Sequence, residues 1–142
     1  MFITRVSRHD IADLEEFFKA HEWDDPHLDQ GVGFIARDGG IVGALRLIEV
    51  EPNVVVVEDV LVKDDRRGGG IGGRLMQAAM NSRGGKLILC CHPERLAFYE
   101  RLGFSESPFD ELPASARDFF EADEAAPHQT PEGHDHHFMT AR

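Results

Sequence analysis

The sequence predicts an α/β (α+β) fold in which a mixed central sheet of six to seven strands is flanked by helices. Two observations support this prediction. A turn-forming segment at residues 38–40 separates two apolar runs, which is typical of an antiparallel hairpin. Further on, an apolar run at 54–62, an amphipathic segment and a second apolar run at 86–91 indicate a β-α-β unit, whose two strands are parallel. Because the chain has 142 residues, we expect a single domain over residues 1–142.

The first thirty residues predict a strand, a helix and a loop. Residues 2–6 are typical of an edge strand, and Ser7 with Asp10 three positions later marks the start of a helix that runs to about Ala20. Residues 20–31 break the helical pattern and predict a loop with at most one short turn. Four apolar side chains share one face of the helix, as expected of a helix that covers a sheet: Ile11, Leu14, Phe17 and Phe18.

The middle of the chain supplies the centre of the predicted sheet. Its third apolar run is nearly continuous, which indicates a strand covered on both faces, and only Glu58 and Asp59 interrupt it. The expected elements are strands at 32–37, 41–50, 54–62 and 86–91, with a helix from Gly70 to about Asn81 before the last strand.

The C-terminal part predicts shorter elements. A helix is expected to start at residues 92–94, because proline is favoured at the first helical position, and to end at Gly103. The elements expected after it are a short strand at 104–106, a helix at 112–121, a loop at 122–135 and a final strand at 137–141.

A glycine-rich segment joins the strand at 54–62 to the helix that follows it. Glycine has no Cβ, so the backbone can adopt positive φ and come close to a ligand. The first N–H groups of a helix have no partner within the helix, and the helix dipole adds partial positive charge, so the segment is suited to a phosphate. Arg66, Arg67 and Arg74 strengthen this preference.

Several interpretations of these glycines compete. A flexible link is the simplest, but the strand before, the helix after and the arginines favour a ligand. A P-loop requires Lys and then Ser or Thr directly after its last glycine, where this chain has Arg74-Leu75. Gly68-x-Gly70-x-x-Gly73 fits the dinucleotide pattern, with Glu94 near the expected acidic position. However, 142 residues are too few for a dinucleotide fold with a substrate domain.

The remaining interpretation depends on two motifs. Arg67-x-x-Gly70-x-Gly72 resembles the pyrophosphate-binding motif of the GNAT superfamily of N-acetyltransferases, and Val60-Leu61-Val62 is similar to the strand end that precedes it in that family. A second motif, Ala97-Phe98-Tyr99-Glu100-Arg101-Leu102-Gly103-Phe104, also resembles this family. The resemblance covers residues 2–104 and leaves 105–142 as a C-terminal extension.

The resemblance implies where acetyl-CoA would bind. In this family the two central parallel strands splay apart, the pantetheine arm pairs with the exposed edge of the first strand, and the glycine segment holds the pyrophosphate. His92 takes the position of an Asn in many members, where it could contact the pantetheine, carry a proton or cap the next helix. The binding residues implied are Val60, Leu61, Val62, Arg67, Gly68, Gly69, Gly70, Ile71, Gly72, Gly73 and His92.

The resemblance also implies the chemistry, which is transfer of an acetyl group to a primary amine by direct attack. Tyr99 matches the family's general acid, which protonates the departing thiolate, and the Val62 N–H matches a donor to the oxyanion. Glu58 is our candidate base, directly or through water, and Asp59 on the opposite face of the strand is the second choice. Family members usually have a second helix beside the acceptor pocket, which this chain replaces with the shorter segment at 20–31.

The cysteines and histidines do not predict a further site. Cys90 and Cys91 are adjacent on a strand, so they face opposite ways and are expected to be small buried side chains. A covalent route through either thiol is disfavoured because only Lys86 is cationic on that strand. We assign no metal to the C-terminal histidines His128, His134, His136 and His137, which are more simply read as solvated side chains.

The charge and hydropathy of the chain exclude some partners. There are 15 Lys and Arg against 26 Asp and Glu, a formal net charge of −11, which disfavours nucleic acid and anionic membranes as partners. No apolar run reaches transmembrane length and the N-terminus lacks a signal-peptide pattern, which predicts a cytoplasmic protein. The oligomeric state stays open, with a homodimer as one alternative.

Two other functions compete with acetyl transfer. A module that binds acyl-CoA without turnover is the first alternative, and Tyr99 argues against it. A nucleotide-binding oxidoreductase is the second, and the length and the hairpin before the glycine segment argue against it. The acceptor stays unidentified. Acidic residues in the segment after the first helix would suit a cationic amine or form a solvated face: Glu22, Asp24, Asp25 and Asp29.

Overall fold

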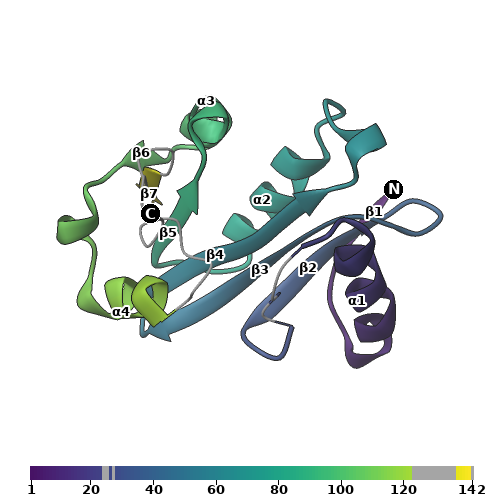
Figure 1. The fold of residues 1–142 in the computed structure, drawn as a ribbon, viewed down its shortest axis with the longest axis horizontal. Coiled ribbons are helices and arrows are strands. Elements are labelled where there is room, and N and C mark those ends of the chain that lie inside the picture. Colours follow the sequence, from purple (N-terminus) through teal and green to yellow (C-terminus); the bar gives the residue numbers. More distant parts are fainter. Residues whose placement is uncertain (24–25, 27, 123–136, 142) are drawn as a thin grey trace. The chain divides into compact units, whose positions relative to one another are not determined.

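The computed structural model describes residues 1–23, 26, 28–122 and 137–141. Its strands form a mixed sheet in the order β1-β2-β3-β4-β5-β7-β6 (Figure 1), which confirms the predicted fold class. The chain divides into two compact units, one made of 1–48 with 57–83 and the other of 49–56 with the described residues from 84 onward. Strands β3 and β4 run through both units.

The first unit contains the N-terminal strands and two helices. Strands β1 and β2 are antiparallel, as are β2 and β3, so the predicted hairpin around residues 38–40 is confirmed. The Asp38 N–H donates a 2.9 Å hydrogen bond to the Gly40 carbonyl and closes the turn. The elements are β1 (Phe2–Arg5), α1 (Ile11–Ala20), β2 (Val32–Arg37), β3 (Ile41–Glu51), β4 (Val54–Val62) and α2 (Ile71–Asn81).

Helix α1 forms where the predicted start signal places it. The Ser7 N–H donates a 2.8 Å hydrogen bond to Asp10 Oδ2, and the Asp10 N–H donates to the Ser7 carbonyl over 2.9 Å, so a short 3-10 turn leads into the helix. The apolar face of α1 then covers one face of the sheet. This core contains Leu14, Phe17, Phe18, Ile35, Ala44 and Leu61.

Helix α2 packs on the opposite face of the same strands. Gly43 neighbours Ala44 along β3 and therefore faces the other way. A Cβ at Gly43 would lie 2.9 Å from Leu75 Cδ1 and 3.0 Å from Ile71 Cγ2. The missing side chain lets α2 approach β3 closely, which fixes the position of the helix start.

The second unit contains the parallel pairing and the C-terminal elements. Val54–Val56 of β4 pair with residues 86–88 of β5 in parallel, as the sequence predicts. Strand β7 is antiparallel to both β5 and β6 and lies between them in the sheet. The elements are β5 (Lys86–Cys91), α3 (Leu96–Arg101), β6 (Ser105–Glu106), α4 (Ala114–Ala122) and β7 (His137–Ala141).

The core of this unit lies under α4. Leu112, Ala116 and Phe120 pack against Val56, Ile88 and Phe138. Helix α4 begins at Ala114 rather than at the predicted Leu112, because Leu112 precedes Pro113 and the residue before a proline is driven away from helical ψ. Leu112 accordingly has an extended ψ of 153°. The predicted loop beyond Ala122 lies outside the described residues.

Candidate functional site

The glycine segment leads from β4 to the N-terminus of α2, as predicted. Gly68 and Gly70 both have φ of +83°, a left-handed conformation that glycine adopts without strain, and Gly70 is the N-cap of α2. A Cβ built at Gly68, Gly70 or Gly73 would meet no atom within 4 Å. The helix start is therefore bordered by open space, and its unpaired N–H groups provide an anion-binding geometry.

The two arginines before the glycines have different partners. Arg66 Nη2 donates a 2.5 Å hydrogen bond to Asp38 Oδ2, and this bond lowers the pKa of the Asp38 carboxyl group. Arg67 Nε donates to the Val62 carbonyl oxygen over 3.1 Å, and its Nη2 lies 3.2 Å from Asp64 Oδ1. Arg66 is thus tied to the β2–β3 turn, whereas Arg67 stays at the junction of strand and glycine segment.

Strand β4 changes its backbone conformation at Asp59. This residue has φ of +53°, which interrupts the extended conformation, and its side chain is buried at 5% exposure. Three residue pairs, from Val54 to Val56, form the parallel ladder to β5. Leu61 is buried while Glu58, Val60 and Val62 are half-buried. A kink of this kind locally disrupts strand pairing, which a strand must do to offer backbone groups to a ligand.

A hydrogen bond from the segment after α1 reaches this kink. Trp23 Nε1 donates to Asp59 Oδ1 over 2.9 Å. Sequence reasoning missed Trp23 as a partner, because the two residues are separated by 36 positions. It also missed the buried Arg46, although Gly33 in the middle of an apolar strand was a usable signal of a close neighbour.

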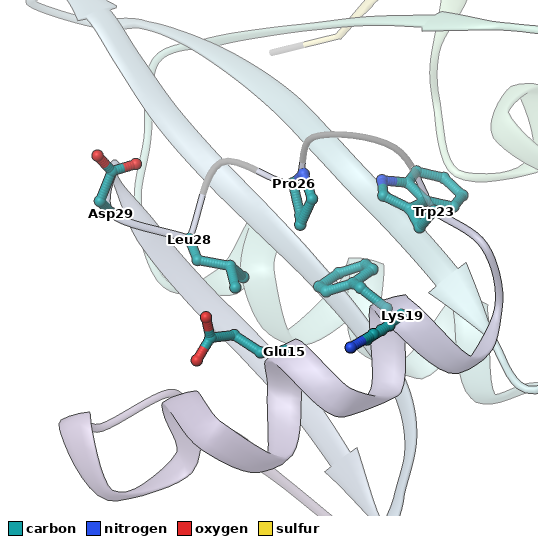
Figure 2. A pocket seen from close by; sticks show the side chains of 7 residues that line it. Glu15, Lys19, Trp23, Pro26, Leu28 and Asp29 are labelled. Carbon is teal, nitrogen blue, oxygen red and sulfur yellow. The ribbon is translucent and has the colours of Figure 1, made fainter.

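A hollow of about 450 Å³ lies between α1 and the segment after it (Figure 2). Helix α1 contributes Glu15, Phe18 and Lys19, and the segment contributes Trp23, Pro26, Leu28 and Asp29. The described part of the segment has no helix, as predicted, and Asp24 and Asp25 lie outside it. The hollow combines apolar walls with two carboxylates and one ammonium group.

Tyr99 lies on α3 in the second unit and is 6% exposed. Its ring packs edge-on against Phe98 and Phe104, with centroids 4.9 and 5.8 Å away. Burial, and secondarily the nearby Cys91, raises the pKa of the phenol above its usual value. The phenol is protonated at neutral pH, and its raised pKa makes it a weaker acid than an exposed tyrosine.

The environment of Cys91 opposes a thiolate. Burial, together with the charges of Glu106 and Glu94, raises the pKa of the Cys91 thiol to about 11. Its Sγ lies 3.8 Å from Met139 Sδ on β7. Cys90, on the other face of β5, is half-buried beside the core under α4. Because the thiolate is the nucleophile, Cys91 is poorly suited to a covalent step.

His92 and His137 occupy different surroundings. His92 is exposed, and its backbone carbonyl accepts a 2.9 Å hydrogen bond from the Arg95 N–H at the turn that begins α3. Its imidazole makes no capping hydrogen bond there, so the capping alternative for the side chain is not realised. His137 Nδ1 lies 2.7 Å from Glu106 Oε2. Within the described residues, no three potential metal ligands gather, and His128, His134 and His136 lie outside them.

The predicted site residues divide between the two units. Glu58, Val60–Val62, Arg67 and the glycine segment belong to the first, and His92 and Tyr99 belong to the second. A mixed sheet with a kinked strand, a left-handed glycine turn and an open helix start defines an α/β protein suited to a phosphate-bearing ligand.

The sequence profile of the acetyltransferase (GNAT) domain matches residues 29–106, more than half of the chain. The chain therefore belongs to the GNAT family and is, by class, an acyl-CoA-dependent N-acyltransferase. No curated protein is similar enough in sequence to count as a relative. None of the described helices is both long and apolar enough to cross a membrane.

Several solved structures have the same fold. A GNAT-family acetyltransferase from Staphylococcus aureus Mu50 has a TM-score of 0.69 and 19% identity, with 99% of this chain and 98% of that chain covered. Rv2747 from Mycobacterium tuberculosis, solved with CoA, has a TM-score of 0.70 and 16% identity, covering 99% and 98%. N-acetylglutamate synthase from Neisseria gonorrhoeae, solved with CoA and N-acetyl-glutamate, has a TM-score of 0.66 and 19% identity over 100% of this chain. The chain spans only 35% of that enzyme's length.

Proposed function

We propose that this protein transfers an acetyl group from acetyl-CoA to a primary amine of a small molecule or peptide by direct attack. The observation that carries the proposal is the left-handed turn at Gly68 and Gly70, which opens free space beside the N-terminus of α2. The N–H groups and the dipole of such a helix start suit the pyrophosphate of a coenzyme. Membership of the GNAT family supports an acyl-CoA as the donor.

The donor would bind along β4 and the glycine segment. Arg67 and the N–H groups of residues 68–73 would hold the pyrophosphate, with Ile71 as the first residue of α2. The backbone of Val60–Val62 would pair with the pantetheine arm beyond the kink at Asp59, and His92 is a further contact in this proposal. Val60 and Val62 are half-buried, and Arg67, residues 68–70 and His92 are exposed, which supports their access to a ligand, whereas Leu61 and Ile71 are buried.

The chemical step needs a free amine, a stabilised oxyanion and a protonated leaving group. The amine nitrogen attacks the thioester carbonyl, the N–C bond forms, and the C–S bond breaks to release CoA. Glu58, or a water that it holds, takes the proton from the amine, and the Val62 N–H donates to the oxyanion. Tyr99, whose phenol is protonated at neutral pH, gives its proton to the thiolate.

A CoA-release assay tests this function. The chain is incubated with acetyl-CoA and a panel of polyamines, aminoglycosides, amino acids and peptides with free N-termini, and released thiol is measured against an amine-free control. We expect amine-dependent release with at least one class. Calorimetric binding of acetyl-CoA without release for any amine would point instead to an acyl-CoA-binding sensor, and absence of binding would overturn both functions.

A further inference from the structure

We infer that Asp59 is a positioning residue. Its hydrogen bond to Trp23 fixes the position of the indole, and the wall that Trp23 forms with Pro26, Leu28 and Asp29 sets the affinity for the acceptor amine. The inference rests on the proposed function, which identifies the ligand as an acceptor amine. It also separates the two acids of β4, because it gives Asp59 a role different from that of the base.

The geometry of Asp59 is built around its hydrogen bond to Trp23. Aspartate tolerates the left-handed conformation better than most residues, so φ of +53° is accessible to it. This backbone conformation accompanies a carboxylate that is buried and accepts the indole N–H over 2.9 Å. The same residue therefore kinks β4 and holds the Trp23 indole.

Arg46 is a second buried charged residue of the same unit, and its electrostatic interaction with Asp59 is attractive. The Arg46 side chain is 4% exposed, and burial lowers the pKa of its guanidinium while the charges of Asp59 and Asp29 oppose this effect. Burying one charge without an opposite charge would be strongly destabilising. Gly33, which pairs with Arg46 across the sheet, leaves the room, since a Cβ there would lie 2.9 Å from Arg46 Nη2.

Trp23 and Gln30, two described residues after α1, are each held by a hydrogen bond. Trp23 is bonded to Asp59, and the Gln30 carbonyl accepts a 2.6 Å hydrogen bond from Arg46 Nη1. Gly31, with φ of +64°, lies so close to β3 that a Cβ would overlap the Leu47 carbonyl oxygen. Trp23 is in this way tied to β4, and Gln30 and Gly31 are held against β3.

Trp23 links this anchor to the hollow of Figure 2. Its indole forms part of the wall, opposite Lys19 and beside Pro26, while its N–H is used by Asp59. Movement of the indole would change the shape of the hollow. An amine bound against this wall would therefore depend on Asp59 without touching it, whereas binding of acetyl-CoA at residues 68–73 would not depend on the indole.

The first arm of the test does not require turnover. Trp23 is the only tryptophan of the chain, so tryptophan fluorescence of the full-length protein reports its surroundings. Asp59→Gly and Asp59→Asn both accept positive φ, but only Asn retains an oxygen for the indole. We expect acrylamide quenching to increase about twofold in Asp59→Gly and much less in Asp59→Asn, because only Gly removes the acceptor. Equal quenching in wild type and Asp59→Gly would overturn the inference.

The second arm uses the panel amine with the highest kcat/KM. Trp23→Phe keeps an aromatic wall and removes the N–H, so we expect the KM for that amine to rise about tenfold. The kcat and the KM for acetyl-CoA should stay within about threefold, because the indole acts through the acceptor side alone. Asp59→Asn should raise the KM for the amine by a smaller factor. Asp13→Asn, an exposed carboxylate on α1 that pairs with Arg37, is the matched control and should change neither KM.

The outcomes separate this inference from the proposed function. A loss of kcat in Asp59→Asn by a factor of about 100 or more, with the amine KM unchanged, would identify Asp59 as the base and overturn the positioning role. An unchanged amine KM in Trp23→Phe would also overturn it. If no panel amine reacts, the proposed function fails, while the quenching arm still decides whether Asp59 holds Trp23.

Discussion

Arg67 is folded back onto the end of β4, where its Nε donates a 3.1 Å hydrogen bond to the Val62 carbonyl oxygen. The ion pair of its Nη2 with Asp64 adds a second restraint on the guanidinium. A side chain held in this way loses little rotamer freedom when a ligand arrives. The structure therefore presents a partly preorganised cation beside the open start of α2.

Replacing Arg67 tests this arrangement. We expect Arg67→Ala to weaken acetyl-CoA binding about tenfold, because it removes a charge-assisted contact to phosphate. Arg67→Lys should recover part of the loss, since it restores the charge without the planar group that bonds to Val62. Isothermal titration calorimetry measures both. Arg66→Ala is the control and should change the affinity by less than about threefold, because Arg66 is paired with Asp38. A larger effect of Arg66→Ala would contradict this assignment of the two arginines.

Replacing Gly70 tests the glycine turn itself. Gly70→Asp places a Cβ and a carboxylate beside the helix start, so the rise in melting temperature caused by acetyl-CoA should disappear. Gly39→Asp is a matched control, because Gly39 also has φ of +83° and open space around its Cβ position. Both variants should be destabilised by about 1 kcal/mol through backbone strain. Acetyl-CoA should still raise the melting temperature of Gly39→Asp. If it also raises that of Gly70→Asp, this loop is excluded as the pyrophosphate site.

Removing the Tyr99 hydroxyl tests the general acid. Tyr99→Phe keeps the ring contacts with Phe98 and Phe104, so the fold and the acetyl-CoA dissociation constant should be preserved. We expect kcat to fall by about 10- to 10³-fold, in the lower part of this range because a thiolate leaves readily. Single-turnover kinetics at saturating substrates give the chemical rate. Full activity under conditions where chemistry limits the rate would reduce Tyr99 to a packing residue.

The Cys91 thiol and the Tyr99 phenol, both buried in the second unit, predict that the folded chain loses stability at alkaline pH. Burial raises the pKa of Cys91 from 9.0 to about 11 and also raises that of Tyr99. Between these values the unfolded chain releases the Cys91 proton while the folded chain keeps it. The stabilisation of the fold that results from the raised pKa of Cys91 is fully present below pH 9 and is lost as the pH rises through about 11.

Chemical denaturation between pH 8 and 11 measures this decline. For Cys91 we expect a loss of up to about 2 kcal/mol in the free energy of unfolding across the window. Cys91→Ala should flatten the curve, start from slightly lower stability because of the lost packing, and keep most of the turnover. An identical slope in wild type and Cys91→Ala would refute the linkage, and abolished turnover would restore the covalent route.

The sequence was most informative where one pattern determined the structure. The bounds of β4 agree with the prediction, because an apolar run that long between two turns leaves little freedom in its ends. Helix α2 was also predicted within a residue, since Gly70 directly before Ile71 and Gly84-Gly85 shortly after Asn81 limit it on both sides. The left-handed turn at Gly68 and Gly70 followed from the absence of a Cβ.

Sequence patterns were least informative about β4 beyond Glu58. Assigning Glu58 and Asp59 to opposite faces assumed a regular extended strand, and a positive φ at an aspartate leaves no mark in the periodicity. The hydrogen bond to Trp23 joins positions too distant for any local pattern to relate. Only the glycine at position 33 indicated that something large, here Arg46, approaches the sheet at that point.

The place of β7 between β5 and β6 has a consequence for how the second unit folds. Residues 87–91 of β5 pair with 137–141, which lie about fifty residues later in the chain. Until that late segment arrives, an apolar strand with the sequence Leu-Ile-Leu-Cys-Cys has one open edge. Such an edge recruits other chains as readily as its own partner, so nascent protein is most exposed to intermolecular strand pairing during this interval. The rate at which β7 docks thus sets how long the chain needs protection from aggregation.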